Sequence, residues 1–330
     1  MVEGKPVKNF LRGLLYLSPA IILLGIFTFY PLFNTILISF REKYNFMRPE
    51  LSGGIGIENY QILLKSNYFR PALLNTMIIV FVSVPLSLIL SLLISVALNS
   101  IKGLKKILQT VFFLPYVTNT IAIGMVFAVM FESRQGLVNA FIKMCGFGGI
   151  DWFGTNMTGA GSLIFENVDF SFLPSILSFI DAEYITGLCV LLIYIVWNSL
   201  PFKILILLSS LQSIDKQYYQ AAKIDGASKF KTFMNITVPF VSPQLVYLMI
   251  TSFIGAWKEY TAVDAIFGVS GGTKGSAQNM TTVVWHIYNK ISNGGSTGMG
   301  QAAAFAVILF IIILLFTGVN RYISNKKVHY

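Results

Sequence analysis

The stretch DKQYYQAAKIDGASKFKTFMNITVPFVSPQL, residues 215–245, is the only long polar segment that lies between two strongly apolar ones. At its start, Asp215 can accept hydrogen bonds from the free N–H groups in the first turn of a helix. Gly226 is the residue that can turn the backbone left-handed where this helix ends. The first half therefore predicts a short helix with a tight turn after it. Its small face, which another protein could approach closely, consists of Ala221, Ala222 and Ala227.

The second half of the stretch predicts another short helix. Ser228 is placed to cap it, and Pro239 and Pro243 are expected to stop it before the next apolar run. A helix, a turn and a helix at a membrane surface would form a docking surface for a partner protein. On the local pattern alone, an amphipathic connector between two spanning helices is an equally good interpretation.

The residues of this stretch also resemble the motif of a known protein family. QAAKIDGA, followed by FMNITVPFVSP, resembles the signature loop of the inner-membrane subunits of binding-protein-dependent ABC transporters. The resemblance implies that the loop is a coupling helix that sits in a cleft of an ATPase subunit. The usual glutamate of the motif is Gln220 here, which keeps a hydrogen-bonding amide but lacks the charge for a salt bridge. The implied ATPase-coupling residues are Gln220, Ala221, Ala222, Asp225, Gly226 and Ala227.

The composition is that of an integral membrane protein. Of the 330 residues, 55% are hydrophobic and only 12% are charged, whereas a soluble domain carries roughly 25% charged residues. A spanning helix needs about 20 apolar residues, and six stretches are long enough. The sequence therefore predicts an all-α protein with six transmembrane helices, at Gly13–Phe40, Pro71–Asn99, Lys106–Phe131, Tyr184–Leu211, Gln244–Gly268 and Gly300–Val319.

The distribution of Lys and Arg residues between the two sides predicts the orientation of these spans. Thirteen Lys and Arg residues and three acidic ones fall on the side that holds both termini, which gives that side the whole formal charge of +10. The positive-inside rule makes this side cytoplasmic and accounts for the basic balance without nucleic acid. The cytoplasmic segments are 1–12, 100–106, 212–243 and 320–330.

Spans four and five carry the residue types that a sugar site needs. Charge inside a span is costly, so Lys258 and Glu259 in span five are functional suspects, although a Lys–Glu pair between helices would explain them too. Lys203 in span four is expected to snorkel toward the cytoplasm. An aromatic face beside amide and hydroxyl groups can recognise a sugar ring. The candidate substrate-binding residues are Trp197, Asn198, Ser199, Phe202, Ser252, Lys258 and Glu259.

Most of these positions also follow from resemblance. The two spans are similar to those that line the substrate site in the maltose-type subunit of the family, the first permease of a heterodimeric pair. The positions implied in this way are Trp197, Ser199, Phe202, Ser252, Ala256 and Glu259. Three further stretches are similar to sugar permeases, namely GIENYQILLKSNYFRPALLNT, FFLPYVTNTIAIGMVF and GVSGGTKGSAQNMTTVVWHIYNK. In the outer loop 132–183, ENVDFSFLP reads as an insertion.

Catalytic and metal chemistry have no support in the sequence. Residues 268–276 lack the spacing of a phosphate loop. The two histidines stand apart, and no nucleophile with a partnered base is visible. We therefore expect no cofactor in this chain, with ATP and Mg bound by a partner subunit.

The sequence favours a multi-pass permease subunit of a carbohydrate ABC importer in the bacterial inner membrane, with cytoplasmic termini. The expected partners are a second homologous permease, two ATPase subunits, an extracellular solute-binding protein and the bilayer. A glycerophosphate importer and, from another class, a secondary transporter remain alternatives. The expected division is an N-terminal part at 1–70, a transport domain at 71–325 with its coupling loop at 212–243, and a tail at 326–330.

Overall fold

The computed structural model describes residues 6–101, 103, 105–153, 182–268 and 280–327. Apart from one isolated bridge between Arg41 and Ile55, the regular structure of these residues is helical. Five helices are long and apolar enough to cross a membrane, and a bent pair makes six if it counts as one span. The all-α fold with multiple spans is therefore confirmed. The insertion at 166–174 and most of the glycine-rich stretch after residue 268 lie outside the described residues.

The chain forms two compact units, and the first contains residues 1–66 and 287–310. Its α-helices are α1 (Pro6–Leu24), α2 (Tyr30–Ser39), α3 (Glu58–Lys65), the last part of α13 (Val283–Asn293) and the first part of α14 (Gly298–Lys327). The motif GIENY holds the end of α2, because the buried Asn59 amide donates to the carbonyls of Ser39 and Arg41 at 3.1 and 2.8 Å. Tyr60 adds a hydroxyl contact of 2.7 Å to Ser39.

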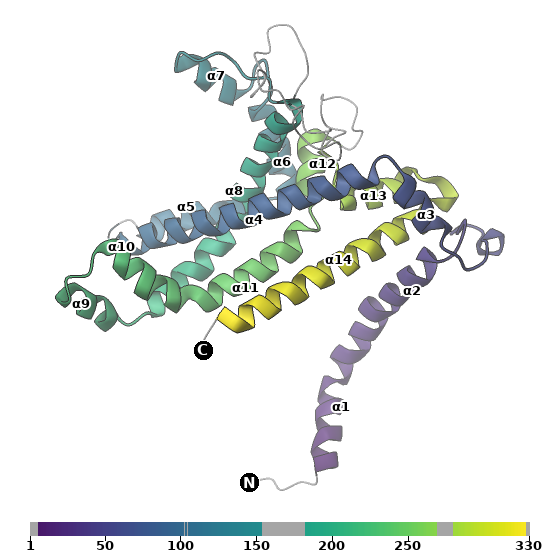
Figure 1. Ribbon diagram of the computed structural model, residues 1–330, viewed down its shortest axis with the longest axis horizontal. Coiled ribbons are helices and arrows are strands. Elements are labelled where there is room, and N and C mark those ends of the chain that lie inside the picture. The colour runs from purple at the N-terminus through teal and green to yellow at the C-terminus, as the bar shows by residue number, and fades with distance from the viewer. Residues whose placement is uncertain (1–5, 102, 104, 154–181, 269–279, 328–330) are drawn as a thin grey trace. The chain divides into compact units, whose positions relative to one another are not determined.

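The second unit contains residues 67–286 and 311–330 and holds the long spans. Its central helix, α8 (Ala182–Ser213), packs against α4 (Phe69–Ser100), α5 (Lys105–Val117) and α11 (Val238–Ala256), which run alongside it in Figure 1. Small residues let membrane helices approach closely. α4 has a row of small residues on the face that is buried in the unit. This row of buried serines consists of Ser83, Ser87, Ser91 and Ser95.

The third span is not one helix. α5 ends at Val117, and α6 (Thr120–Met130) begins three residues later. The axes of the two helices differ in direction by 99°. The side chain of Asn119 caps α6 by accepting from the N–H groups of Ile121 and Ala122. A proline such as Pro115 bends a helix, but Asn119 starts a new helix in a new direction. α6 then packs against α12 (Thr261–Phe267), where a Cβ on Gly124 would lie only 2.4 Å from that of Ala265.

The fifth span is displaced from the predicted Gln244–Gly268. The apolar helix runs from Lys229 to Ala256, and the chain breaks there before α12. Pro239 and Pro243 do not stop the second loop helix as predicted, since α10 (Lys229–Thr232) continues through a π-helical turn, Phe233–Thr237, into α11.

Two prolines inside long helices follow a π-helical turn closely, whereas Pro85 in α4 and Pro201 in α8 do not. One turn, Gly25–Phe29, ends two residues before Pro31, and the other, Phe233–Thr237, ends two residues before Pro239. A proline ring normally clashes with the carbonyl four residues earlier. A π turn widens the helix by one residue and shifts those carbonyls. The helix therefore absorbs the proline and continues.

Residues 132–153 fold around one asparagine. Asn139, on α7 (Leu137–Met144), is 1% exposed. Its amide donates to the carbonyls of Ser133 and Ile150, and its carbonyl accepts from the N–H of Ile150 and from the indole of Trp152. These four hydrogen bonds hold Ser133, Ile150 and Trp152 against α7.

Candidate functional site

The loop that links α8 to α11 has the geometry expected from its residues. Asp215 caps α9 (Lys216–Ile224) by accepting from the N–H of Gln217 at 2.9 Å. Gly226 has a φ of +65°. Its N–H donates to the carbonyl of Lys223 at 3.2 Å, and the N–H of Ala227 donates to Ala222 at 2.9 Å. These two bonds form a Schellman motif, which requires the left-handed conformation at the glycine.

The second loop helix, α10, is capped as predicted, because Ser228 accepts from the N–H of Lys231 at 3.3 Å. Of the six predicted coupling residues, Ala222 is buried and Ala227 is half-buried, while the others are exposed. Two apolar side chains beside the turn are also exposed to solvent. Ile224 is 86% exposed and Phe230 is 74% exposed. Exposed apolar groups next to a rigid turn are typical of a protein-binding surface.

The predicted substrate residues gather, with one exception, around a single cavity of about 450 Å³ in the second unit. Asn198, Ser199 and Phe202 come from α8, and Ser252 comes from α11. Lys258 and Glu259 lie in the break between α11 and α12 and line the same cavity. Further hydroxyl and aromatic groups in its wall belong to Ser83, Ser87, Tyr116, Thr120, Tyr194, Thr251 and Thr261.

Glu259 does not lie on the helix that carries Ser252. The helix ends at Ala256, and the Glu259 carboxylate reaches forward to accept from the N–H of Ala262 at 2.8 Å. Its backbone carbonyl accepts from the hydroxyl of Thr282 at 2.7 Å. A carboxylate at a helix start is favourable for the unpaired N–H groups there. The structure thus gives Glu259 a backbone partner where a Lys258 pair was expected, and Lys258 is exposed.

Trp197 is the exception among the predicted substrate residues. It is half-buried on α8 and does not appear in the wall of the cavity. Its ring packs against Phe127 of α6, with the ring centroids 5.4 Å apart. α8 contributes two aromatic rings to the cavity, those of Tyr194 and Phe202, and the Phe202 ring stacks with that of Tyr116 at 5.9 Å and 15°. Contact between Trp197 and a substrate therefore stays a prediction.

Lys203 does not snorkel as predicted. It is 5% exposed, and its Nζ donates to the hydroxyl of Ser87 on α4 and to that of Ser199 on α8 at 3.2 Å. These two hydroxyls replace part of the hydration of the ammonium group, which lowers the free-energy cost of burying it. The only sequence signal was the row of serines at every fourth position from Ser83, which places hydroxyls along one face of a helix.

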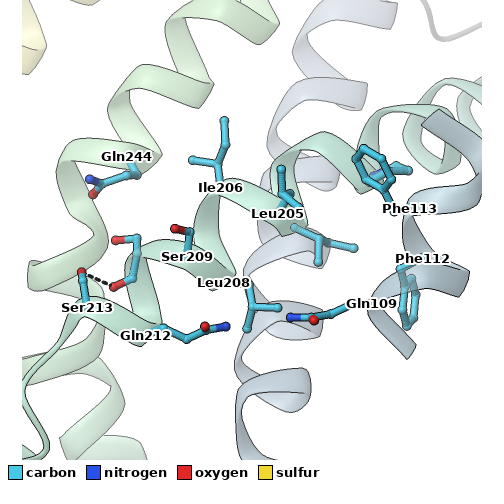
Figure 2. Close-up of a pocket in the computed structure, with 13 residues that line it drawn as sticks. Gln109, Phe112, Phe113, Leu205, Ile206, Leu208, Ser209, Gln212, Ser213 and Gln244 are labelled. Atoms are coloured by element: carbon cyan, nitrogen blue, oxygen red, sulfur yellow. Dashed lines mark hydrogen bonds between the residues drawn. The ribbon is translucent and has the colours of Figure 1, made fainter. Parts of the chain in front are cut away.

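A second cavity, of about 680 Å³, lies between α5, α8 and α11 and is shown in Figure 2. The side chains of Gln109 and Gln212 point toward each other across it. The Oε1 atom of Gln244 is buried and has no hydrogen-bond partner among the described residues. No predicted substrate residue lines this cavity.

The spans, the capped loop and a cavity with hydroxyl, amide and charged groups in its wall are the features of a multi-pass membrane transport subunit. Residues 83–329 match the family model of the binding-protein-dependent transport system inner membrane component. The match covers most of the chain, and the chain belongs to this family. The resemblance seen in the loop sequence is therefore confirmed. As a member of this family, the chain is a transport subunit of the inner membrane and not the ATPase.

Similar proteins are named for sugar transport. The chain is 28% identical over 306 residues to the trehalose/maltose transport system permease protein MalF of Thermococcus litoralis, covering 92% of this chain and 90% of that protein. It is 27% identical over 319 residues to the lactose transport system permease protein LacF of Rhizobium radiobacter, at 96% and 95% coverage.

A solved structure has the same fold. A chain in the crystal structure of a bacterial alginate ABC transporter, in complex with an alginate pentasaccharide-bound periplasmic protein, aligns with a TM-score of 0.75 over 98% of both chains. The sequence identity is 19%. This likeness supports the overall helical fold.

Proposed function

We propose that this chain is the permease subunit of an ABC importer and forms the translocation path for a carbohydrate. An extracellular binding protein delivers the cargo, and a separate ATPase drives its passage. The observation that carries the proposal is the cavity of about 450 Å³ whose wall combines hydroxyls, an amide and stacked aromatic rings. These groups match a polyhydroxyl ring, which needs many hydrogen bonds and an apolar face. The names of the relatives support the same cargo class.

The loop from α9 to α10 is the proposed docking site for the ATPase. Its turn is fixed by two backbone bonds, and the adjacent Ile224 and Phe230 offer apolar surface to a partner. With this loop on the cytoplasmic side, the charge count places both termini there as well. A transporter of this kind would contain a second homologous permease and two ATPase copies.

Reconstitution tests the proposal. The chain alone in nanodiscs should neither bind ATP nor carry maltotriose across the bilayer. Addition of the second permease, the ATPase and the binding protein should produce ATP-dependent uptake of an oligosaccharide. Uptake by the chain alone, driven by an ion gradient, would contradict the proposal and favour a secondary transporter.

A further inference from the structure

A buried cation forms part of the cavity wall. Lys203 lies in α8, ten residues before the end of the helix at Ser213, and is 5% exposed. Its Nζ donates to Ser87 and Ser199, and both of these serines line the same cavity. A lysine ammonium has three N–H donors. Two hydroxyls therefore leave one donor and the whole positive charge for another group.

The charges around the cavity do not balance. Lys203, Lys258 and Glu259 are the charged side chains in its wall, which leaves an excess of one positive charge. The Glu259 carboxylate is engaged by the N–H of Ala262. Among the described residues, the hydrogen-bond partners of Lys203 are the two neutral hydroxyls. A cation at this depth is costly without a negative partner.

We propose that the cargo is a carbohydrate that carries an anionic group, a carboxylate or a phosphate, and that Lys203 is the residue that receives this group. The proposal rests on the carbohydrate function proposed above. Hydrogen bonds from an ammonium to an anion are shorter and stronger than those between neutral groups. Ser87 and Ser199 fix the amine in place, so that it can face the anion without first being ordered. Other wall hydroxyls already donate within the protein, Tyr194 to the carbonyl of Thr120 and Thr251 to that of Tyr247, so their oxygens can accept hydrogen bonds from sugar hydroxyls.

The test compares matched saccharides that differ in one kind of charge. The membrane complex is purified through a tag on this chain, without the binding protein, and is placed in nanodiscs. Calorimetry then measures the affinity for galacturonic acid trisaccharide against maltotriose, and for trehalose 6-phosphate against trehalose. We expect at least tenfold tighter binding of the anionic member in one pair, and the pair shows whether the anion is a carboxylate or a phosphate.

Three variants assign that preference to the lysine. Lys203→Met keeps the length of the side chain and removes the charge, so the preference should fall below threefold. Lys203→Arg keeps the charge and should retain it. Lys143→Met removes an exposed cation from α7, outside both cavities, and should leave the preference unchanged.

Each outcome decides the matter. Equal affinities within both pairs would overturn the anionic cargo even if Lys203→Met failed to fold, because the wild-type protein alone gives that result. An unchanged preference in a folded Lys203→Met protein would overturn the role of the lysine. Binding of neutral sugars only would reject the anion but keep the carbohydrate function. Failure of all four saccharides to bind would reject both proposals.

Discussion

The turn at Gly226 is the feature of the loop that a single substitution can disrupt most cleanly. Its φ of +65° lies in the left-handed region, and a Cβ built on it meets no heavy atom within 4 Å. The Cβ atom of a side chain at this position therefore causes no collision. The whole cost of Gly226→Val comes from the backbone conformation that the two Schellman bonds impose.

The size of that cost follows from the conformation. A residue other than glycine pays roughly 1–2 kcal/mol in the left-handed region, and a β-branched side chain is the least suited to it. A penalty of this size lowers the ratio of the native turn to other conformations by roughly 5- to 30-fold. Asparagine tolerates this region better than other side chains. The expected order of loop function is Gly226, Gly226→Asn, Gly226→Ala and then Gly226→Val.

The assay is co-purification of the ATPase with the tagged chain, at equal amounts of the chain in the membrane, followed by ATP-driven uptake. Gly226→Val should lose most of the ATPase, whereas Gly226→Asn should keep most of it. Two results would refute the reasoning. One is wild-type co-purification by Gly226→Val, and the other is an equal loss in the Asn and Val variants, since these differ chiefly in their tolerance of a positive φ.

Three other substitutions test the walls of the second unit. Gly124→Leu forces α6 away from Ala265 and should cost about 1–3 kcal/mol in unfolding free energy, seen as a lower Tm, while Gly255→Ala, which faces open space, should not. Glu259→Ala removes the acceptor for the Ala262 N–H and should destabilise by about 1 kcal/mol, whereas Glu259→Gln, which keeps an acceptor, should melt like the wild type. Trp197→Ala should reduce uptake without changing the ligand affinity of the binding protein. Wild-type uptake by this variant would show that the ring is only packing against Phe127.

The long spans could be predicted because length and hydropathy decide them. α4, α8 and the spanning part of α14 begin and end within three residues of the predicted stretches. Their interiors are apolar over more than 20 residues, so no other structure satisfies the backbone within a bilayer. The tight turn at Gly226 could also be predicted from the sequence. The cap at Asp215 and the glycine determine the start and the end of the short helix through local interactions alone.

The broken and displaced spans depend on interactions that no local pattern reveals. Pro239 should end a helix by its own chemistry, yet a π turn before it lets the helix continue. An asparagine within an apolar run, such as Asn119, does not by itself indicate that a new helix will begin there at 99° to the previous one. In the same way, the burial of Lys203 depends on Ser87, which is 116 residues away in sequence. Six of the seven predicted substrate residues were brought together around one cavity, but the partners of Lys203 and Glu259 required the structure.

The docking loop and the cavity are connected by continuous helices on both sides. α8, which carries Ser199 and Lys203, ends at Ser213, two residues before the cap at Asp215. On the other side, one helix runs from Lys229 through the π turn to Ala256, a length of about 40 Å at 1.5 Å per residue. A displacement of the loop would therefore reach the cavity directly through α8, whereas on the other side it would pass through the π turn before it reached α11. The π turn at 233–237 is where such a movement would be absorbed most easily, since the regular hydrogen-bond pattern is interrupted there.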